Sequence, residues 1–158
     1  LADEFGYRLV IDHGTEAVLL ADRLAERGVP VLIGPLLTSR SKVELRNRSL
    51  ANPARLAAAG VELGIITDHP VVPIHLLHVQ AALAVREGLD PAAALRAVTL
   101  TPARVLGLDD RLGSLEPGKH ATLCVWSGDP LDARSRVESA WIEGHQVYST
   151  GPDSPSAF

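Results

Sequence analysis

The chain has 158 residues, 46% of them apolar, and a formal net charge of −4 at pH 7, which is enough for one domain with a hydrophobic core, with or without an appendage. The acidic balance and the 4% of aromatic residues argue against a nucleic-acid partner, because no stripe of Lys and Arg could neutralise phosphates and few rings could stack on bases. No segment approaches the roughly 20 apolar residues that span a bilayer and no charged-then-apolar leader opens the chain, so we predict a cytoplasmic protein with no membrane partner.

The first residues, Leu1 to Gly6, are typical of the last turn of a helix that a glycine closes. The chain also contains no methionine. We therefore expect it to be a fragment of a longer protein.

Three apolar runs, at residues 7–12, 29–34 and 61–67, predict β-strands. A helix is expected from Thr15 to about Arg27, where Gly28 ends it. The runs recur about 27 residues apart, close to the roughly 30 residues per unit of a (β/α)₈ barrel. The sequence thus predicts an α/β fold with three successive βα units, whereas a full barrel has eight.

Pairs of a capping residue and a proline predict three further helix starts, because proline suits the first helical position. These pairs are Asn52-Pro53, Asp90-Pro91 and Thr101-Pro102. Apolar spacing predicts one more helix over residues 74–87.

After Leu108 the pattern changes to short antiparallel strands, expected at residues 121–126, 137–142 and 146–148 with a hairpin turn at Glu143-Gly144. The single cysteine, Cys124, rules out an internal disulfide, and its apolar neighbours predict a buried core residue instead of a nucleophile. The Pro/Ser-rich residues 151–158 are expected to form a loose tail.

The third apolar run, from Leu63 to Ile66, lacks polar alternation, so we expect both of its faces to be covered. It ends on Asp68, and a carboxylate after a buried strand is a candidate metal ligand or catalytic base. His13 follows the first run in the same way, and parallel strands end at one rim, so the two side chains should meet there. Both are good ligands for zinc and similar divalent ions. The alternative is that Asp68 only caps the turn at Pro70.

Four other polar residues have two interpretations each. His69 either binds substrate or packs under its loop, and Arg40 either forks onto a substrate carboxylate or lies on a solvated loop. His75 and His78 share a helix face, where solvation is favoured over metal binding because no carboxylate is placed beside them.

Four segments cover most of the chain with a recognisable pattern: VIDHGTEA (10–17), IITDHPVVP (65–73), AVTLTPARVLGLDDRLGSLEPGK (97–119) and VESAWIEGHQVYS (137–149). They resemble the amidohydrolase superfamily, in its imidazolonepropionase-like branch. The resemblance implies the last three βα units of a TIM-type (β/α)₈ barrel in residues 1–107, part of a small β-sandwich in 108–150, and the tail in 151–158. The family has Asp-Ala-Asp-Leu where this chain has residues 120–123, His-Ala-Thr-Leu, which puts local stability there in doubt.

The resemblance further implies that His13 is the metal-binding histidine after the sixth barrel strand and Asp68 the aspartate after the eighth. In the family this aspartate contacts the metal and takes the proton from the water that attacks a C–N bond of a small-molecule substrate. The implied cofactor is a divalent metal, zinc or else iron or manganese. The other family ligands would precede Leu1, so the 158 residues hold only part of such a site.

Three hypotheses therefore stand. The chain is part of a metal-dependent amidohydrolase that acts on a cyclic amide or amide-like molecule. Alternatively, it is a noncatalytic fragment that folds and self-associates, because three barrel strands leave two open edges. The third hypothesis, an unrelated small α/β binding domain, makes the tail motifs coincidental, and no glycine-rich phosphate loop supports a nucleotide binder.

Overall fold

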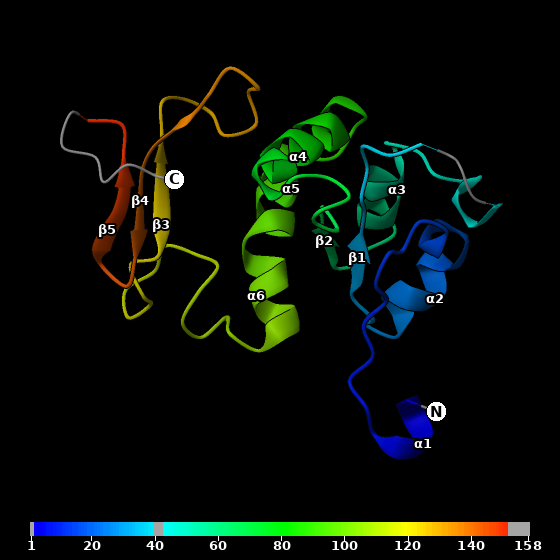
Figure 1. Ribbon diagram of the computed structural model, residues 1–158. Coiled ribbons are helices and arrows are strands. Elements are labelled where there is room, and N and C mark those ends of the chain that lie inside the picture. Colours follow the sequence, from blue (N-terminus) through cyan, green and yellow to red (C-terminus); the bar gives the residue numbers. More distant parts are fainter. Residues whose placement is uncertain (1, 40–42, 152–158) are drawn as a thin grey trace.

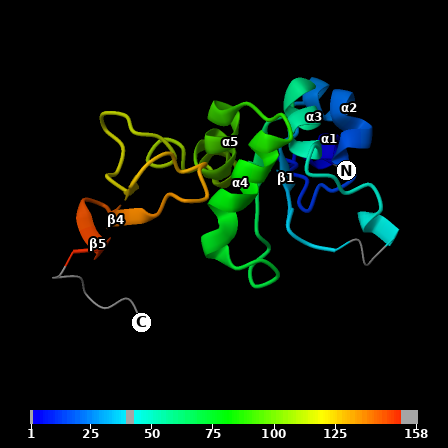
Figure 2. The same cartoon turned by 90° about the horizontal axis from the view of Figure 1, so that it is seen from above.

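The structure, a computed structural model, describes residues 2–39 and 43–151. It has an α/β part built around two parallel strands and a separate antiparallel sheet near the C-terminal end (Figure 1). Helices α4 and α5 lie between the two sheets, and the view from above shows the same arrangement (Figure 2). No helix in the described ranges is long and apolar enough to cross a membrane.

The elements in the N-terminal half are α1 (Ala2–Phe5), η1 (Ala17–Leu20), α2 (Ala21–Glu26), β1 (Val31–Ile33), η2 (Val43–Leu45), α3 (Asn52–Ala58) and β2 (Leu63–Ile65). Those in the C-terminal half are η3 (Ile74–Leu76), α4 (Leu77–Arg86), α5 (Pro91–Val98), α6 (Leu100–Leu106), β3 (Leu123–Trp126), β4 (Val137–Ile142) and β5 (His145–Ser149).

Strands β1 and β2 pair in parallel, with Val31 opposite Leu63. The predicted first strand at residues 7–12 is wrong, because only Ile11 bridges to β1. Its amide donates to the Pro30 carbonyl at 3.0 Å and its carbonyl accepts from Leu32 at 2.8 Å. The remainder of this segment has no ladder on either side within the described residues, so the order of parallel segments is the Ile11 bridge, β1 and β2.

The prediction that both faces of the run from Leu63 to Ile66 are covered is confirmed for β2, whose three residues are all buried, whereas β1 buries Val31 and Ile33 and leaves Leu32 partly exposed. Val31 is fully buried, and Leu63 and Ile65 are only 6% and 3% exposed. Helices α4 and α5 reach the core with alanines such as Ala81 and Ala94, whose small side chains let these helices lie close together. Burial on both faces is what a parallel sheet needs, since neither face is left for water.

One buried polar side chain, Gln80 of α4, joins the ends of the two parallel strands. Its Oε1 accepts from the amide of Leu36 and, at 3.4 Å, from that of Leu37, just after β1. Its Nε2 donates to the carbonyl of Ile66, just after β2, at 3.2 Å. Gln80 is fully buried, so these are the bonds that satisfy its amide away from water.

Of the three helix starts predicted from a capping residue followed by proline, one is confirmed and two are wrong. Asp90 caps α5, and its carboxylate accepts from the Ala93 amide at 2.8 Å, which confirms that prediction. Asn52 was wrongly predicted as a cap. It is the first residue of α3, is 1% exposed, and donates instead to the carbonyls of Thr15 and Asn47 at 3.2 and 3.0 Å. Thr101 is likewise inside α6, whose N-cap is Thr99, because burial of Thr101 against the core places the helix start earlier.

Strands β3, β4 and β5 form an antiparallel sheet, with the expected turn at Glu143-Gly144. The prediction that Cys124 is buried is wrong: it is exposed, because no second sheet covers β3 in the described part of the chain. The imidazole of His78 in α4 lies against the Trp126 ring, with centroids 5.1 Å apart. His78 is therefore half-buried at this contact and is not on a solvated helix face.

The residues that differ from the family pattern at 120–123 do contact the hairpin turn. Thr122 Oγ1 accepts from the Glu143 amide at 3.1 Å, and His120 Nδ1 lies 3.4 Å from Glu143 Oε1. These two side chains thus contact the hairpin turn directly.

Replacing Gln80 with alanine tests the strand-end contacts. We expect Q80A to lower the free energy of unfolding by about 3 kcal/mol, because it leaves the Leu36 amide and the Ile66 carbonyl buried without partners and opens a cavity. Urea denaturation measures the change. Q146A, at an exposed glutamine of β5, is the matched control and should stay within about 0.5 kcal/mol of the unchanged protein. Equal effects of the two variants would contradict a role for Gln80.

Candidate metal centre

The backbone around the parallel strands places His13 and Asp68 at one rim. Gly14, next to His13, donates its amide to the Leu32 carbonyl at 2.9 Å, which fixes the turn after Ile11 beside β1. Ile66 donates to the Ile33 carbonyl at 3.0 Å and continues the β1–β2 pairing almost to Asp68. Both side chains therefore leave the backbone where parallel strands end.

The two side chains meet across the end of β1. His13 Nε2 lies 3.2 Å from Asp68 Oδ2, although the residues are 55 positions apart in the sequence. Their side chains are 50% and 40% exposed, so solvent and small molecules reach both. The predicted convergence on one rim is thus present in the structure.

Gly34 ends the strand that lies between these two residues. A Cβ atom at this position would lie 2.1 Å from the carbonyl oxygen of Ile66, and the φ angle of Gly34 is +148°. Both the contact and the angle require glycine. The close approach of the chain segments beneath His13 and Asp68 depends on this missing side chain.

His13 and Asp68 also share an unusual backbone conformation. Each has φ of 51°, and the only other non-glycine residue with positive φ in the described ranges is Glu143, in the hairpin turn. An L-residue in the left-handed region is strained, and such residues concentrate at functional sites. Neither position is glycine, so the chain retains the imidazole and the carboxylate despite this cost.

The turn after Asp68 is closed by main-chain atoms. Val71 donates its amide to the Asp68 carbonyl at 2.8 Å, and Val72 donates to the Thr67 carbonyl at 3.2 Å. The contact of the Asp68 carboxylate is with His13. This geometry favours the site interpretation of Asp68 over the turn-capping interpretation.

Sequence analysis missed a third residue, Asp12. Its Oδ1 accepts from the His13 amide at 2.8 Å, and its Oδ2 lies 3.4 Å from His13 Nδ1. The imidazole is thus flanked by a carboxylate on each nitrogen. The sequence signal was the Asp-His pair at the end of an apolar run, since a carboxylate often orients a neighbouring histidine.

The other candidate residues lie outside this contact. His69 is exposed, so the alternative that it packs under its loop is wrong, and its substrate role stays a prediction. His75 is exposed as well, and Arg40 lies outside the described residues.

The His13–Asp68 pair suits a divalent metal in both donor type and spacing. Two ligands that each lie about 2.0–2.1 Å from a tetrahedral zinc are about 3.3 Å apart, and the two donor atoms here are 3.2 Å apart. Within residues 2–39 and 43–151, however, no group of three or more His, Cys, Asp or Glu side chains is arranged to hold an ion. The described residues therefore supply two donors of a site that needs more.

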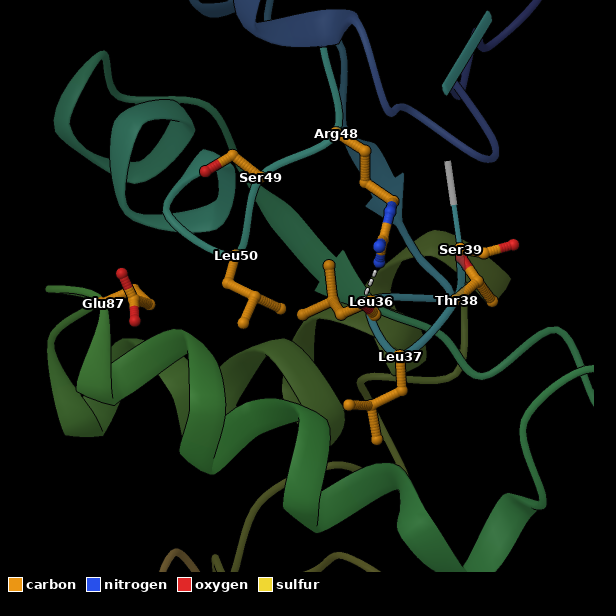
Figure 3. Close-up of a pocket in the computed structure, with 8 residues that line it drawn as sticks. All are labelled: Leu36, Leu37, Thr38, Ser39, Arg48, Ser49, Leu50 and Glu87. Carbon is orange, nitrogen blue, oxygen red and sulfur yellow. Dashed lines mark hydrogen bonds between the residues drawn. The ribbon is translucent and has the colours of Figure 1, made fainter. Parts of the chain in front are cut away.

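A cavity of about 590 Å³ lies under the loop after β1, between α3 and α4 (Figure 3). Its wall combines leucines, hydroxyl groups and two charged side chains; the lining residues are Leu36, Leu37, Thr38, Ser39, Arg48, Ser49, Leu50 and Glu87. The Arg48 guanidinium donates to the Leu36 carbonyl and so fixes this loop (Figure 3). Neither His13 nor Asp68 lines the cavity, which is separate from the metal-type donors.

Comparison with known proteins now decides the family. The model of the amidohydrolase family matches residues 4–149. The chain belongs to the amidohydrolase family. This amidohydrolase chain is α/β, like the barrel-type family members that it matches.

Individual relatives agree with this assignment. The chain superimposes on an amidohydrolase from Thermotoga maritima with a TM-score of 0.90 and 48% identity, covering 94% of this chain and 39% of that one. It is 43% identical over 90 residues to an imidazolonepropionase from Aromatoleum aromaticum, covering 54% of this chain and 21% of the relative. A zinc-containing adenosine deaminase from Xanthomonas campestris is 29% identical with a TM-score of 0.65, over 93% of this chain and 39% of that one. The amidohydrolase chain thus spans well under half the length of these relatives.

Glycine substitutions test the backbone strain in this amidohydrolase. We expect H13G and D68G to leave the free energy of unfolding unchanged or to raise it by up to about 1 kcal/mol, because glycine removes about 1–2 kcal/mol of left-handed strain and costs about 0.5–1 kcal/mol in chain entropy. Urea denaturation measures both. The matched control is E143G, which replaces the third positive-φ residue by glycine in the hairpin turn, away from the site, and so measures the effect of relieving the same strain elsewhere. A loss of more than about 1 kcal/mol in the site variants would show that the side chains stabilise the fold.

Proposed function

We propose that this chain contributes His13 and Asp68 to the metal site of an amidohydrolase that hydrolyses a C–N bond in a cyclic amide or amide-like small molecule. The observation that carries the proposal is the contact of 3.2 Å between the His13 and Asp68 donor atoms at the strand ends. Family membership supports it, since one relative named above is described as an imidazolonepropionase and another as an adenosine deaminase with bound zinc.

Each residue has a distinct role in this proposal. His13 presents the lone pair of Nε2 as a neutral ligand. Asp68 uses one carboxylate oxygen as a ligand and the other to take the proton from the attacking water, and it then returns this proton to the leaving nitrogen. A divalent ion, when bound, supplies the chemistry of lowering the water pKa and polarising the scissile carbonyl. We favour zinc, with iron and manganese as alternatives.

The same proposal covers the architecture of the chain. Residues 1–107 are proposed to be the last three βα units of a (β/α)₈ barrel and residues 108–150 part of a β-sandwich, while the expected tail at 151–158 lies, from residue 152 on, outside the described residues. The parallel order of the Ile11 bridge, β1 and β2 supports the barrel part, and the antiparallel sheet β3–β5 supports the second part. The remaining ligands would come from the rest of the barrel.

Zinc titration of the purified chain tests the metal proposal. We expect the chain to bind zinc through His13 and Asp68. The variants H13A and D68A should each weaken zinc binding at least tenfold, because each removes one of these two donors. Competition against a chromogenic chelator measures the constants. Elemental mass spectrometry after dialysis against a weak chelator then gives the metal retained per chain.

The control variants retain every donor of the pair. H75A removes an exposed histidine on η3 and E143G removes a carboxylate in the hairpin turn, so both should bind zinc as the unchanged chain does. If D68A and H75A weaken zinc binding equally, the ion occupies surface histidines and the proposed site is wrong.

A second candidate function is a noncatalytic chain that self-associates. It is favoured by exposed apolar side chains in the segment that leads to the unpaired edge at Ile11: Tyr7 and Leu9 are 69% and 43% exposed, and Phe5, at the end of α1, is 56% exposed. An open edge with exposed apolar residues is a surface on which another chain can pair. The proposed partner is a second copy of this chain.

Sedimentation velocity tests this alternative. We expect the unchanged chain to form a dimer or larger assembly at micromolar concentration, and we expect Y7K to shift it to monomer, because a charge on the edge opposes pairing. L115K is the matched control, since Leu115 is 78% exposed but lies in a turn region away from this edge. A compact monomer of the unchanged chain at all concentrations would contradict self-association.

A further inference from the structure

Asp12 binds two parts of the residue that follows it. One carboxylate oxygen accepts from the His13 amide at 2.8 Å, and the other lies 3.4 Å from Nδ1 of the same residue. The first contact fixes the carboxylate relative to the backbone. The second contact is longer than an ordinary hydrogen bond, and it indicates which way the ring faces, because Nδ1 can lie near this oxygen only when Nε2 points away from it.

The direction in which Nε2 points is toward Asp68. His13 Nε2 lies 3.2 Å from Asp68 Oδ2, so the groups run in the order Asp12, imidazole, Asp68. A histidine that donates a metal-binding lone pair from one nitrogen must carry its proton on the other, and a hydrogen-bond acceptor at the second nitrogen sets this tautomer.

We propose that Asp12 is the positioning residue of His13: it holds the ring and keeps the proton on Nδ1, which leaves the lone pair of Nε2 for a metal ion at Asp68. This inference rests on the proposed function where it concerns the metal. The ring orientation and the tautomer do not depend on bound metal and can be measured without it.

Asp12 acts by orienting the His13 imidazole and not by Coulomb attraction to it. The Asp12 and His13 side chains are 58% and 50% exposed, so water weakens the Coulomb interaction between them. Water also competes for Nδ1, and a carboxylate fixed by the backbone bond of 2.8 Å limits this competition.

The variant D12N reverses the polarity at Nδ1 with little change in shape. When the asparagine oxygen keeps the bond to the His13 amide, its NH₂ group faces Nδ1 and donates to it. Nδ1 must then accept, and the proton of the neutral ring moves to Nε2. An imidazole with a proton on Nε2 has no lone pair there for a metal ion.

Asp68 competes for the ring proton, so the tautomer is compared in a D68A background. At about pH 9, long-range ¹⁵N–¹H spectra distinguish the two tautomers of a neutral imidazole. We expect D68A to carry the His13 proton on Nδ1 and D68A/D12N to carry it on Nε2. A D68A/D22N variant, altered at an exposed aspartate of α2, should match D68A. D12A should give a mixture of tautomers, because only water remains at Nδ1.

Zinc affinity gives the second measurement. We expect D12N with Asp68 intact to bind zinc 10 to 100-fold more weakly than the unchanged chain, and D22N to bind it equally. An unchanged tautomer in D68A/D12N would overturn the positioning role. A changed tautomer with unchanged zinc affinity would overturn its relevance to the metal. A changed tautomer in a chain that binds no zinc would support the positioning of His13 and overturn the proposed function.

Discussion

The buried amide of Gln80 is the interaction on which the arrangement of the strand ends depends. It accepts from the backbone just after β1 and donates to the carbonyl of Ile66 just after β2. Because the side chain is fully buried, an error in the relative position of the two strands would leave polar groups unpaired in the core. This contact therefore determines where the chain leaves β2, two residues before Asp68.

Close packing and backbone strain convert this arrangement into a site. The absence of a side chain at Gly34 lets β1 lie directly against the Ile66 backbone, and the left-handed conformations of His13 and Asp68 then bring their side chains to 3.2 Å. The two functions of the backbone are distinct. The tight packing of Gly34 against Ile66 is favourable. The strained backbone of His13 and Asp68, in contrast, costs free energy of folding that the rest of the fold offsets.

The site differs from the cavity under the loop after β1 in its chemistry. The rim offers imidazole and carboxylate donors in contact with each other, which suit a divalent ion, while the cavity offers leucines, hydroxyl groups, one guanidinium and the carboxylate of Glu87, and no imidazole. Family membership and the superposition on longer amidohydrolases are consistent with a rim that is shared with further strands. Residues 2–39 and 43–151 by themselves bring together two metal-type donors and the carboxylate of Asp12.

The sequence by itself determined the family, the buried strand before Asp68, the Asp90 cap and the antiparallel hairpin, because each depends on residues close together in the chain. It did not determine that residues 7–12 form only one bridge, that Asn52 and Thr101 lie inside helices, or that Cys124 is exposed. Those outcomes depend on which neighbours cover a segment, and covering neighbours are distant in sequence. The sequence also predicted that His13 and Asp68 converge on one rim, but only the tertiary structure decided the distance of 3.2 Å between them and the place of Asp12 behind the imidazole. Distances across strand ends arise from packing and backbone strain, and no local pattern encodes them.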